Sequence, residues 1–472
     1  MTGLTRHVAE WIAGLGIDQV PEIARNVLRH AVLDTLACGL HGRSTEWAGI
    51  VEDWARGAGR AQGAGRASGG GPGDASIWGD GAPALRAEMA ALVNGISCHA
   101  FELDDYHPTK LHPGAVVVPA ALAVGEKLDA SGEDLMAAIA AGYEVMIRTS
   151  AALDPSTARL QGWHITGVTG TFGAATACAR LLGLDGEKTS WALGIAGTQS
   201  SGLFAFNADG AMTKRFHAGD AARAGVVAAE LAAAGFTGPT QIFEAEDGGF
   251  LKAHSSSVDE KQLRNGLGAE WRLENTAFKP YSCCGSLHAY IDAALELRAR
   301  FGEPGGRRVR IGLPRVIEVQ CGYDYAPGTA LNAQMSSRFC VATALRHGQV
   351  LPGEFSADCL ADPETVALAG RIEQSHDPAL DDIYPANFCG WVELESEPGI
   401  GDFARAFRQD PSGSPANPEK DQAMIDKFRR LAGDIMASDQ TAKIERAALA
   451  LEATDARALV ATLATRESAA AE

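Results

Sequence analysis

The fold of this chain is decided by the stretch Gly132-Glu-Asp-Leu-Met-Ala-Ala-Ile-Ala-Ala-Gly-Tyr-Glu-Val-Met-Ile-Arg-Thr-Ser-Ala-Ala-Leu153. Its larger apolar residues recur at helical spacing, and alanine and glycine fill many of the positions between them. Faces made of such small residues let helices pack closely against one another. The stretch therefore predicts a compact helical bundle rather than a sheet.

Similar patterns extend to both sides of this stretch. Further helices are predicted at 5–56, 83–101, 169–182, 189–206, 217–234 and 417–470. The character changes after about residue 270, where 315–321 and 391–395 alternate like strands around helical patterns at 333–347 and 362–373. Residues 57–73 are rich in Gly, Ala, Arg and Ser and are expected to form a surface loop, a tolerated insertion being favoured over a lid.

These elements predict a mainly α fold with two domains. A large all-helical domain is formed by both chain ends, residues 1–269 and 401–472, and a smaller α+β domain of residues 270–400 is inserted before the C-terminal helices. At 472 residues, the chain is long enough for two cores. The cleft between two such domains is the default place for a ligand site.

Composition excludes several classes of function. The 59 acidic residues outnumber the 41 basic ones, for a net charge of −18, which argues against a nucleic-acid surface and against adhesion to anionic membranes. No apolar run approaches the roughly 20 residues that span a bilayer. The N-terminus lacks the apolar core of a signal peptide, so we expect a cytoplasmic protein. The nine cysteines show no Cys-x-x-Cys spacing, and most are expected to be buried small hydrophobic residues.

The chemistry is expected in His99-Ala-Phe-Glu-Leu-Asp-Asp-Tyr-His-Pro-Thr-Lys-Leu-His-Pro-Gly114. This stretch crowds acids, imidazoles, an amine and a phenol together: Glu102, Asp104, Asp105, Tyr106, His107, Lys110 and His112. Groups held this close shift one another's pKa values toward neutrality, as proton transfer requires. A solvated loop with a helix N-cap is the alternative, because clusters of charge are often structural.

Two helix starts carry further candidates. His164 lies in a Gly/Thr-rich turn before a helix, where backbone N–H groups favour anions. Thr213 is expected to cap another helix, whose first turn holds Lys214 and Arg215, although the helix macrodipole disfavours cations there. A bound anion would explain this placement. The alternatives are an incidental histidine in a capping turn and two surface side chains that reach back to water.

A lysine and two tyrosines complete the candidates. Lys279, between a phenylalanine and a proline, is expected to have a partly desolvated amine that suits proton transfer. The adjacent Cys283-Cys284 pair matches no cysteine-hydrolase signature, so packing is the favoured interpretation. Tyr323 and Tyr325 follow a predicted strand and could reach a cleft, although such tyrosines more often belong to the core or its rim. Dinucleotide-binding, Walker and nucleophile-elbow motifs are absent from the sequence.

Taken together, these segments resemble the MmgE/PrpD family over about residues 5–470. The resemblance is carried by His-Ala-Phe-Glu-Leu-Asp-Asp with His-Pro-Gly, by Gly-Trp-His164, by Ala-Leu-Gly-Ile-Ala-Gly-Thr-Gln-Ser-Ser-Gly202, by Lys214-Arg-Phe-His-Ala-Gly219 and by Phe-Lys279-Pro-Tyr-Ser-Cys-Cys. The family includes 2-methylcitrate dehydratase, cis-aconitate decarboxylase and iminodisuccinate epimerase. It implies a large helical domain with a smaller α+β lid, no metal or organic cofactor, and a homodimer.

The resemblance also implies site residues. Matched to the decarboxylase branch, the acid, histidines, lysines and tyrosine fall on Glu102, His112, His164, Lys214, Lys279 and Tyr323, with Tyr325 as the alternative tyrosine. Three positions depart from the branches. Tyr106 stands where the decarboxylase has threonine, Lys110 lies where a lysine is proposed as a base in the epimerase, and Arg159 stands where the epimerase has tyrosine.

The three activities share one chemical problem, a carbanion or enediolate beside a carboxylate, which cationic side chains must stabilise if no metal does. We expect Lys214 with Arg215 or Lys279 to hold substrate carboxylates, and His112 or His164 to act as base. The other histidine or Tyr323 would be the acid. Substrate-binding positions are expected at Asp104, Asp105, Tyr106, Lys110 and Arg215, with both aspartates more suited to orienting the histidines than to reacting.

The predicted function is a cofactor-independent dehydratase or hydratase of a small di- or tricarboxylic acid, such as a 2-methylcitrate-like compound. The alternatives are an epimerase of an iminodisuccinate-like N-substituted aspartate and a decarboxylase of a cis-aconitate-like acid. A binding protein for small acids that has lost activity is the non-enzymatic alternative. No nucleic-acid or membrane partner is expected.

Overall fold

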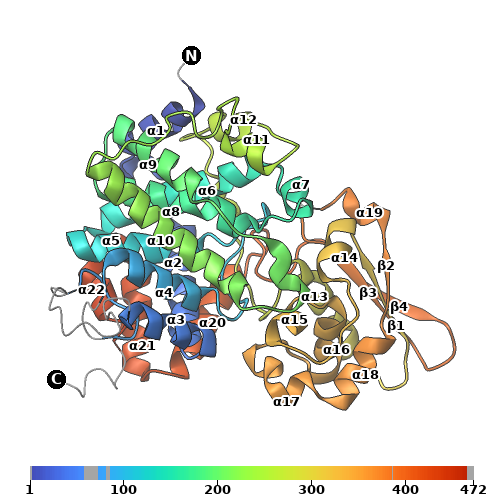
Figure 1. Ribbon diagram of the computed structural model, residues 1–472. Coiled ribbons are helices and arrows are strands. Elements are labelled where there is room, and N and C mark those ends of the chain that lie inside the picture. The colour runs from blue at the N-terminus through green and yellow to red at the C-terminus, as the bar shows by residue number, and fades with distance from the viewer. Residues whose placement is uncertain (1–2, 58–72, 81–84, 385, 465–472) are drawn as a thin grey trace.

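The computed structural model describes residues 3–57, 73–80, 85–384 and 386–464 and shows a large helical part beside a smaller part that contains a sheet (Figure 1). The mainly α fold is thereby confirmed. Of the expected surface loop at 57–73, residues 58–72 lie outside the described residues. Among the described helices, none combines the length and the apolar composition that crossing a membrane requires.

The helical part is built mostly from the first half of the chain. Its helices are α1 (Leu4–Gly14), α2 (Glu22–Gly42), α3 (Glu46–Gly57), α4 (Ala87–Cys98), α5 (Gly114–Leu128), α6 (Gly132–Ala152), α7 (Pro155–Leu160), α8 (Ile165–Leu181), α9 (Gly186–Thr198), α10 (Thr213–Ala233), α11 (Phe250–His254) and α12 (Lys261–Arg264). The stretch 132–153 forms α6, as predicted, and Ser131 caps it by accepting a hydrogen bond from the Asp134 N–H.

The end of the chain returns to this helical part. Helices α20 (Lys420–Gly433), α21 (Ser438–Leu449) and α22 (Ala456–Ala461) lie beside the N-terminal helices in Figure 1. Phe428 and Ile444, both fully buried, belong to the same hydrophobic core as Leu28 on α2. Both chain ends therefore build one core.

Close helix packing depends on glycine where α4 meets α10. A Cβ atom on Gly219 would lie 2.4 Å from the carbonyl oxygen of Leu92, and one on Gly95 would lie 2.8 Å from the Cα of Gly219. Neither contact leaves room for a larger side chain. The start of α10, which carries Lys214, is in this way held against the loop that follows α4.

The smaller part has its own core around a four-stranded sheet. Its elements are α13 (His288–Phe301), β1 (Val309–Leu313), α14 (Arg315–Cys321), α15 (Ala330–Gln334), α16 (Ser337–His347), α17 (Ala357–Leu360), α18 (Pro363–Arg371), β2 (Glu373–His376), α19 (Pro378–Asp381), β3 (Gly390–Glu395) and β4 (Phe403–Arg408). The strand order is β2-β1-β3-β4, with β2 parallel to β1 and the other neighbours antiparallel. The predicted strand at 391–395 is confirmed within β3.

The predicted strand at 315–321 is wrong, because these residues form helix α14. Strand β1 ends just before them, and Pro314 is the N-cap of the helix. Ile317 and Cys321 are buried at i, i+4 spacing, whereas Val319, which an alternating strand would bury with them, is 49% exposed. A short apolar run of this kind fits either period.

Two other boundaries also move. The predicted domain boundary at residue 400 divides the hairpin of β3 and β4, so the sheet extends to Arg408. The predicted helix at 189–206 ends at Thr198, and the Gly/Ser-rich residues after it form a turn before a short 3-10 helix, Phe204–Ala208.

Candidate active site

A pocket between the two parts gathers most of the predicted site residues. The helical part contributes Glu102, His112, His164 and Lys214, together with Tyr106, Lys110 and Arg159. The smaller part contributes Cys284, Ser286, Gln320 and Phe388. A pocket is therefore present at the junction of the two parts, where the sequence predicts a ligand site.

The loop of residues 99–113 supplies much of one wall. Its backbone pairs with a second loop, residues 276–284, through two hydrogen bonds between Tyr106 and Ala277 of 2.9 and 2.8 Å. Glu102 and Lys110 both adopt left-handed backbone conformations, with φ of 55° and 66°, which non-glycine residues rarely adopt. Such strain persists only where surrounding structure enforces it, and it is concentrated at functional sites.

A cluster of acids and ammonium groups lies at one end of the pocket. Glu102 forms an ion pair with Lys214, and its other oxygen lies 3.5 Å from the Nζ of Lys279. Burial alone would raise the pKa of Glu102, but the two ammonium groups outweigh burial and hold that pKa well below its usual range. Burial lowers the pKa of Lys214, whereas Glu102 and Asp104 outweigh burial at Lys279 and raise its pKa.

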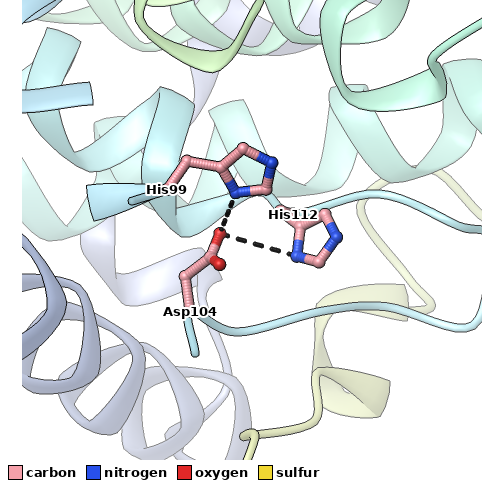
Figure 2. Close-up of side chains that lie close together, drawn as sticks. All are labelled: His99, Asp104 and His112. Carbon is pink, nitrogen blue, oxygen red and sulfur yellow. Dashed lines mark hydrogen bonds and ion pairs between the residues drawn. The ribbon is translucent and has the colours of Figure 1, made fainter. Parts of the chain in front are cut away.

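Two histidines share the carboxylate of Asp104, as Figure 2 shows. The Nδ1 atoms of His99 and His112 lie 2.8 and 3.5 Å from the same oxygen of Asp104. Burial opposes ionisation of Asp104, but the nearby imidazoles and Lys279 lower its pKa, so it accepts hydrogen bonds as an anion. His99 therefore donates from Nδ1 and accepts from the Nζ of Lys214 at Nε2, over 3.1 Å.

The tautomer of His112 follows from its backbone partner. Its Nδ1 lies 2.8 Å from the carbonyl oxygen of Asp105, which can only accept, so Nδ1 carries the hydrogen. Burial, followed by the charge of Lys279, lowers the pKa of His112 well below its usual value. His112 is therefore a neutral imidazole whose basic atom is Nε2, on the side of the ring away from Asp104 in Figure 2. A neutral imidazole with a free nitrogen at a pocket wall has the form of a general base.

His164 is held by a partner that the sequence analysis did not single out. Its Nδ1 lies 3.0 Å from the Nδ1 of His217, so only one of the two atoms carries the hydrogen and the rings have opposite tautomers. Burial, followed by His217 and Lys214, lowers the pKa of His164 well below its usual value. His164 is therefore a second neutral imidazole at the pocket wall.

Family models and known proteins match the chain over nearly all of its length. The model of the MmgE/PrpD N-terminal domain matches residues 6–262, and that of the C-terminal domain matches residues 281–453. The chain belongs to the MmgE/PrpD family. The chain is 30% identical to a cis-aconitate decarboxylase of Aspergillus terreus over 96% of this chain and 94% of the relative. Identity to the cis-aconitate decarboxylase-like protein oryM of Aspergillus oryzae is 29%, over 95% and 94% of the two chains. The human cis-aconitate decarboxylase is 26% identical, over 93% and 90%.

Not every predicted site residue of this MmgE/PrpD protein lines the pocket. Lys279 lies behind Glu102 and is 1% exposed. Asp104 is fully buried and contacts both His99 and His112 rather than the pocket. Asp105, with a pKa raised far above normal by burial and then by neighbouring acids, accepts from the Gly114 N–H and the Tyr143 hydroxyl. It therefore serves the start of α5 rather than the pocket.

Arg215, Tyr323 and Tyr325 also face elsewhere. Arg215 stacks on Trp47, 4.7 Å from the ring centroid, and donates a hydrogen bond to Gln334. It faces away from the pocket that Lys214 lines, because adjacent residues on a helix point in different directions. Tyr323 donates to the carbonyl oxygen of Asn332 at 2.5 Å, and Tyr325 donates to that of Leu360 at 3.0 Å. Thr213 is the first residue of α10 rather than its N-cap, which is Met212.

Tyr384 is the tyrosine that the sequence analysis missed. Its hydroxyl accepts from the ammonium of Lys110, which also lies 4.1 Å from the centre of its ring. Tyr384 lies between α19 and β3, far along the chain from the other site residues, and no motif marks it.

Lys427 on α20 is a second missed residue. Its buried Nζ donates to the carbonyl oxygens of Leu103 and Lys279, at 2.6 and 3.1 Å, and lies 2.5 Å from Asp34 on α2. One ammonium group therefore anchors both the 99–113 loop and the 276–284 loop to the helical core.

His99, Asp104 and His112 are close enough to one another to hold a metal ion. Their surroundings do not favour one, because Lys214 lies 3.1 Å from His99 and Lys279 lies 3.9 Å from Asp104. Two ammonium groups at this range repel a divalent cation. The Nδ1 atoms also already carry hydrogens for their hydrogen bonds, so we interpret the trio as a network that orients the imidazoles.

Proposed function

We propose that this protein is a cofactor-independent lyase that removes a proton beside a carboxylate of a small di- or tricarboxylic acid and expels a hydroxyl group as water. The observation that carries this proposal is that His112 is neutral and has its basic nitrogen at Nε2. His112 and Lys214 line the same pocket. A base and a cation at one wall suit a reaction that places negative charge on a carboxylate.

Lys214 is suited to stabilise that charge. Of its three N–H groups, one is directed to Glu102 and one to His99, which leaves one for a substrate. Because Glu102 and His99 hold the ammonium group in place, it does not have to reorganise as charge develops. Donors fixed in this way contribute about 2.7–4 kcal/mol each to catalysis in comparable sites.

The proposed reaction has two proton transfers. His112 takes the proton from the carbon next to the carboxylate, and the electron pair of that C–H bond moves into the carboxylate, which Lys214 stabilises. The pair then returns to form a C=C bond as the C–O bond of the hydroxyl breaks. Both histidines start neutral, so the acid that converts the leaving hydroxide to water is the imidazolium that His112 becomes once it holds the proton from carbon.

Decarboxylation of a cis-aconitate-like acid is the second candidate. The curated relatives of A. terreus and human are both named cis-aconitate decarboxylases. In that reaction the C–C bond to a carboxylate breaks, CO₂ leaves, and the electron pair left on carbon takes a proton from the ammonium of Lys214. The cluster around Lys214 would serve both reactions, because both pass through a carbanion beside a carboxylate.

Proton NMR in D₂O separates the candidates. The purified protein would be incubated with 2-methylcitrate, citrate, malate and cis-aconitate. A new alkene signal with loss of the hydroxylated acid supports dehydration, and CO₂ release with one deuterium incorporated supports decarboxylation. Deuterium exchange without any other change supports epimerisation. If the wild-type protein converts none of these acids, even at a tenfold higher protein concentration, the proposal is wrong.

We also infer that the protein forms a homodimer, as the family resemblance implies. Sedimentation equilibrium of the full chain tests this, and a monomer at micromolar concentration would contradict it.

A further inference from the structure

The charges at the two ends of the pocket do not balance in the same way. At the end described above, the ammonium groups of Lys214 and Lys279 face the carboxylates of Glu102 and Asp104. The nearby imidazoles are neutral, because burial lowers their pKa values. This end therefore has no surplus positive charge to offset a substrate with two or three carboxylates.

At the other end, two cations line the pocket without a carboxylate. Neither Lys110 nor Arg159 lies within ion-pair distance of an Asp or Glu among the residues that the structure describes. Lys110 has the hydroxyl and ring of Tyr384 as its contacts, and Arg159 lies 3.2 Å above the ring of Phe204. The Nε of Arg159 is buried and has no hydrogen-bond partner within the described part of the chain.

Two half-buried cations that line one pocket without a carboxylate are unfavourable unless an anion joins them. Burial, with the charge of Arg159 as a smaller contribution, lowers the pKa of Lys110 to about 7. Burial likewise lowers the pKa of Arg159 to about 10. Both shifts follow from burial of a positive charge, and a carboxylate beside the two groups would oppose them.

We propose that Lys110 and Arg159 form a carboxylate subsite, which binds the carboxylate of the substrate most distant from the reacting carbon. This inference rests on the proposed function, because it places the reacting end at His112 and Lys214. It narrows the substrate to an acid with at least two carboxylates, one held at each end of the pocket. Arg159 presents a planar fork that suits a carboxylate, and its unpartnered Nε supplies one of the donors.

Calorimetric binding of two unreactive acids tests the subsite. The probes are propane-1,2,3-tricarboxylate and butanoate, which has a single carboxylate and cannot reach both ends. In Lys110→Gln and Arg159→Gln, the Kd for the tricarboxylate should rise about 10–100-fold, as expected for loss of a hydrogen bond to a charged group. The Kd for butanoate should rise by a similar factor, because a lone carboxylate is expected to bind at the two cations that have no carboxylate of their own. Arg159→Lys should recover part of the affinity, because it restores the charge without the fork.

Lys252→Gln and Arg6→Gln are the matched controls, because both side chains are exposed and lie outside the pocket. An unchanged Kd for the tricarboxylate in the Lys110 and Arg159 variants would overturn the subsite while leaving the proposed function intact. Failure of wild-type protein to bind the tricarboxylate at millimolar concentration, together with no turnover of any di- or tricarboxylate, would overturn both.

Discussion

At one end of the pocket Lys214 and Lys279 are each matched by a carboxylate, whereas at the other end Lys110 and Arg159 have none within the described residues. The matched cations are held in fixed positions by several partners each. The unmatched cations rest on the rings of Tyr384 and Phe204.

This difference separates two tasks. Donors that are fixed before the substrate arrives stabilise charge that develops during the reaction, so they act on kcat. Cations that lack a partner until the substrate arrives gain most on binding, so they act on KM. Substitutions at the matched end should therefore lower kcat, and substitutions at the unmatched end should raise KM.

The largest effect is expected at the matched end, for His112→Gln. Loss of the base should lower kcat about 10²–10⁴-fold, with a smaller change in KM. Steady-state kinetics with the acid identified by NMR measures both constants, and His7→Gln on α1 is the control for loss of a histidine. Unchanged kcat in a correctly folded variant, as judged by its thermal unfolding, would remove His112 from the mechanism.

Lys214→Met should have the next largest effect. Removal of one fixed donor should lower kcat about 10²–10³-fold, because the negative charge that develops on the substrate loses its ammonium partner. Lys252→Met, at an exposed position, is the control. A rise in KM with normal kcat would mean that Lys214 only binds the substrate, and the proposed contrast between the two ends would then be wrong.

The pH dependence should differ between the ends. Around Lys110 lie Arg159, Tyr384, Cys321, Asp154 and Cys284, whose pKa is lowered to about 6, first by a hydrogen bond with Cys321. With its pKa lowered to about 7, Lys110 is charged below that pH and loses its charge as pH rises through it. A bound carboxylate raises the pH at which Lys110 loses its charge. KM for a tricarboxylate should therefore rise about tenfold for each pH unit above about 7.

Over the same range kcat should show no histidine limb. His112 and His164 remain neutral through pH 6–7, because burial lowers their pKa values well below normal. Profiles of kcat and KM from pH 5.5 to 9 check both statements. A kcat that falls below pH 6.5 would show that an essential histidine titrates normally.

The smallest effect is expected for Tyr384→Phe. This substitution removes the hydroxyl that accepts from Lys110 but keeps the ring, so KM for a tricarboxylate should rise about 2–10-fold. Tyr325→Phe is the matched control, because its hydroxyl donates to the Leu360 carbonyl away from the pocket. An equal effect of the two substitutions would exclude a specific role for Tyr384.

The sequence predicts the helical part well because α6 and its neighbours repeat a strong pattern of large and small residues over many turns. It also singles out Glu102 and His112, which line the pocket, because the loop that carries them is dense in ionisable groups. Tyr323 could not be placed correctly, since the short run before it fits a strand or a helix equally well. Adjacent residues such as Lys214 and Arg215 separate only when the direction of each side chain is known.

No local pattern in the sequence predicts that Lys427 anchors the two site loops. It contacts Leu103 and Lys279, more than a hundred residues away from it along the chain, and its signal in the sequence is a lysine in an amphipathic helix. Pairs of this kind become visible only when the fold brings them together.

The position of Lys427 also constrains how the protein matures on the ribosome. Helices α1–α12 and the sheet are translated first, and the anchor of both site loops follows only after strand β4. Until that residue leaves the exit tunnel, the carbonyl oxygens of Leu103 and Lys279 lack their ammonium donor. Because α20–α22 also complete the helical core, a nascent chain is expected to gain its full core and its activity together, only after these helices have emerged.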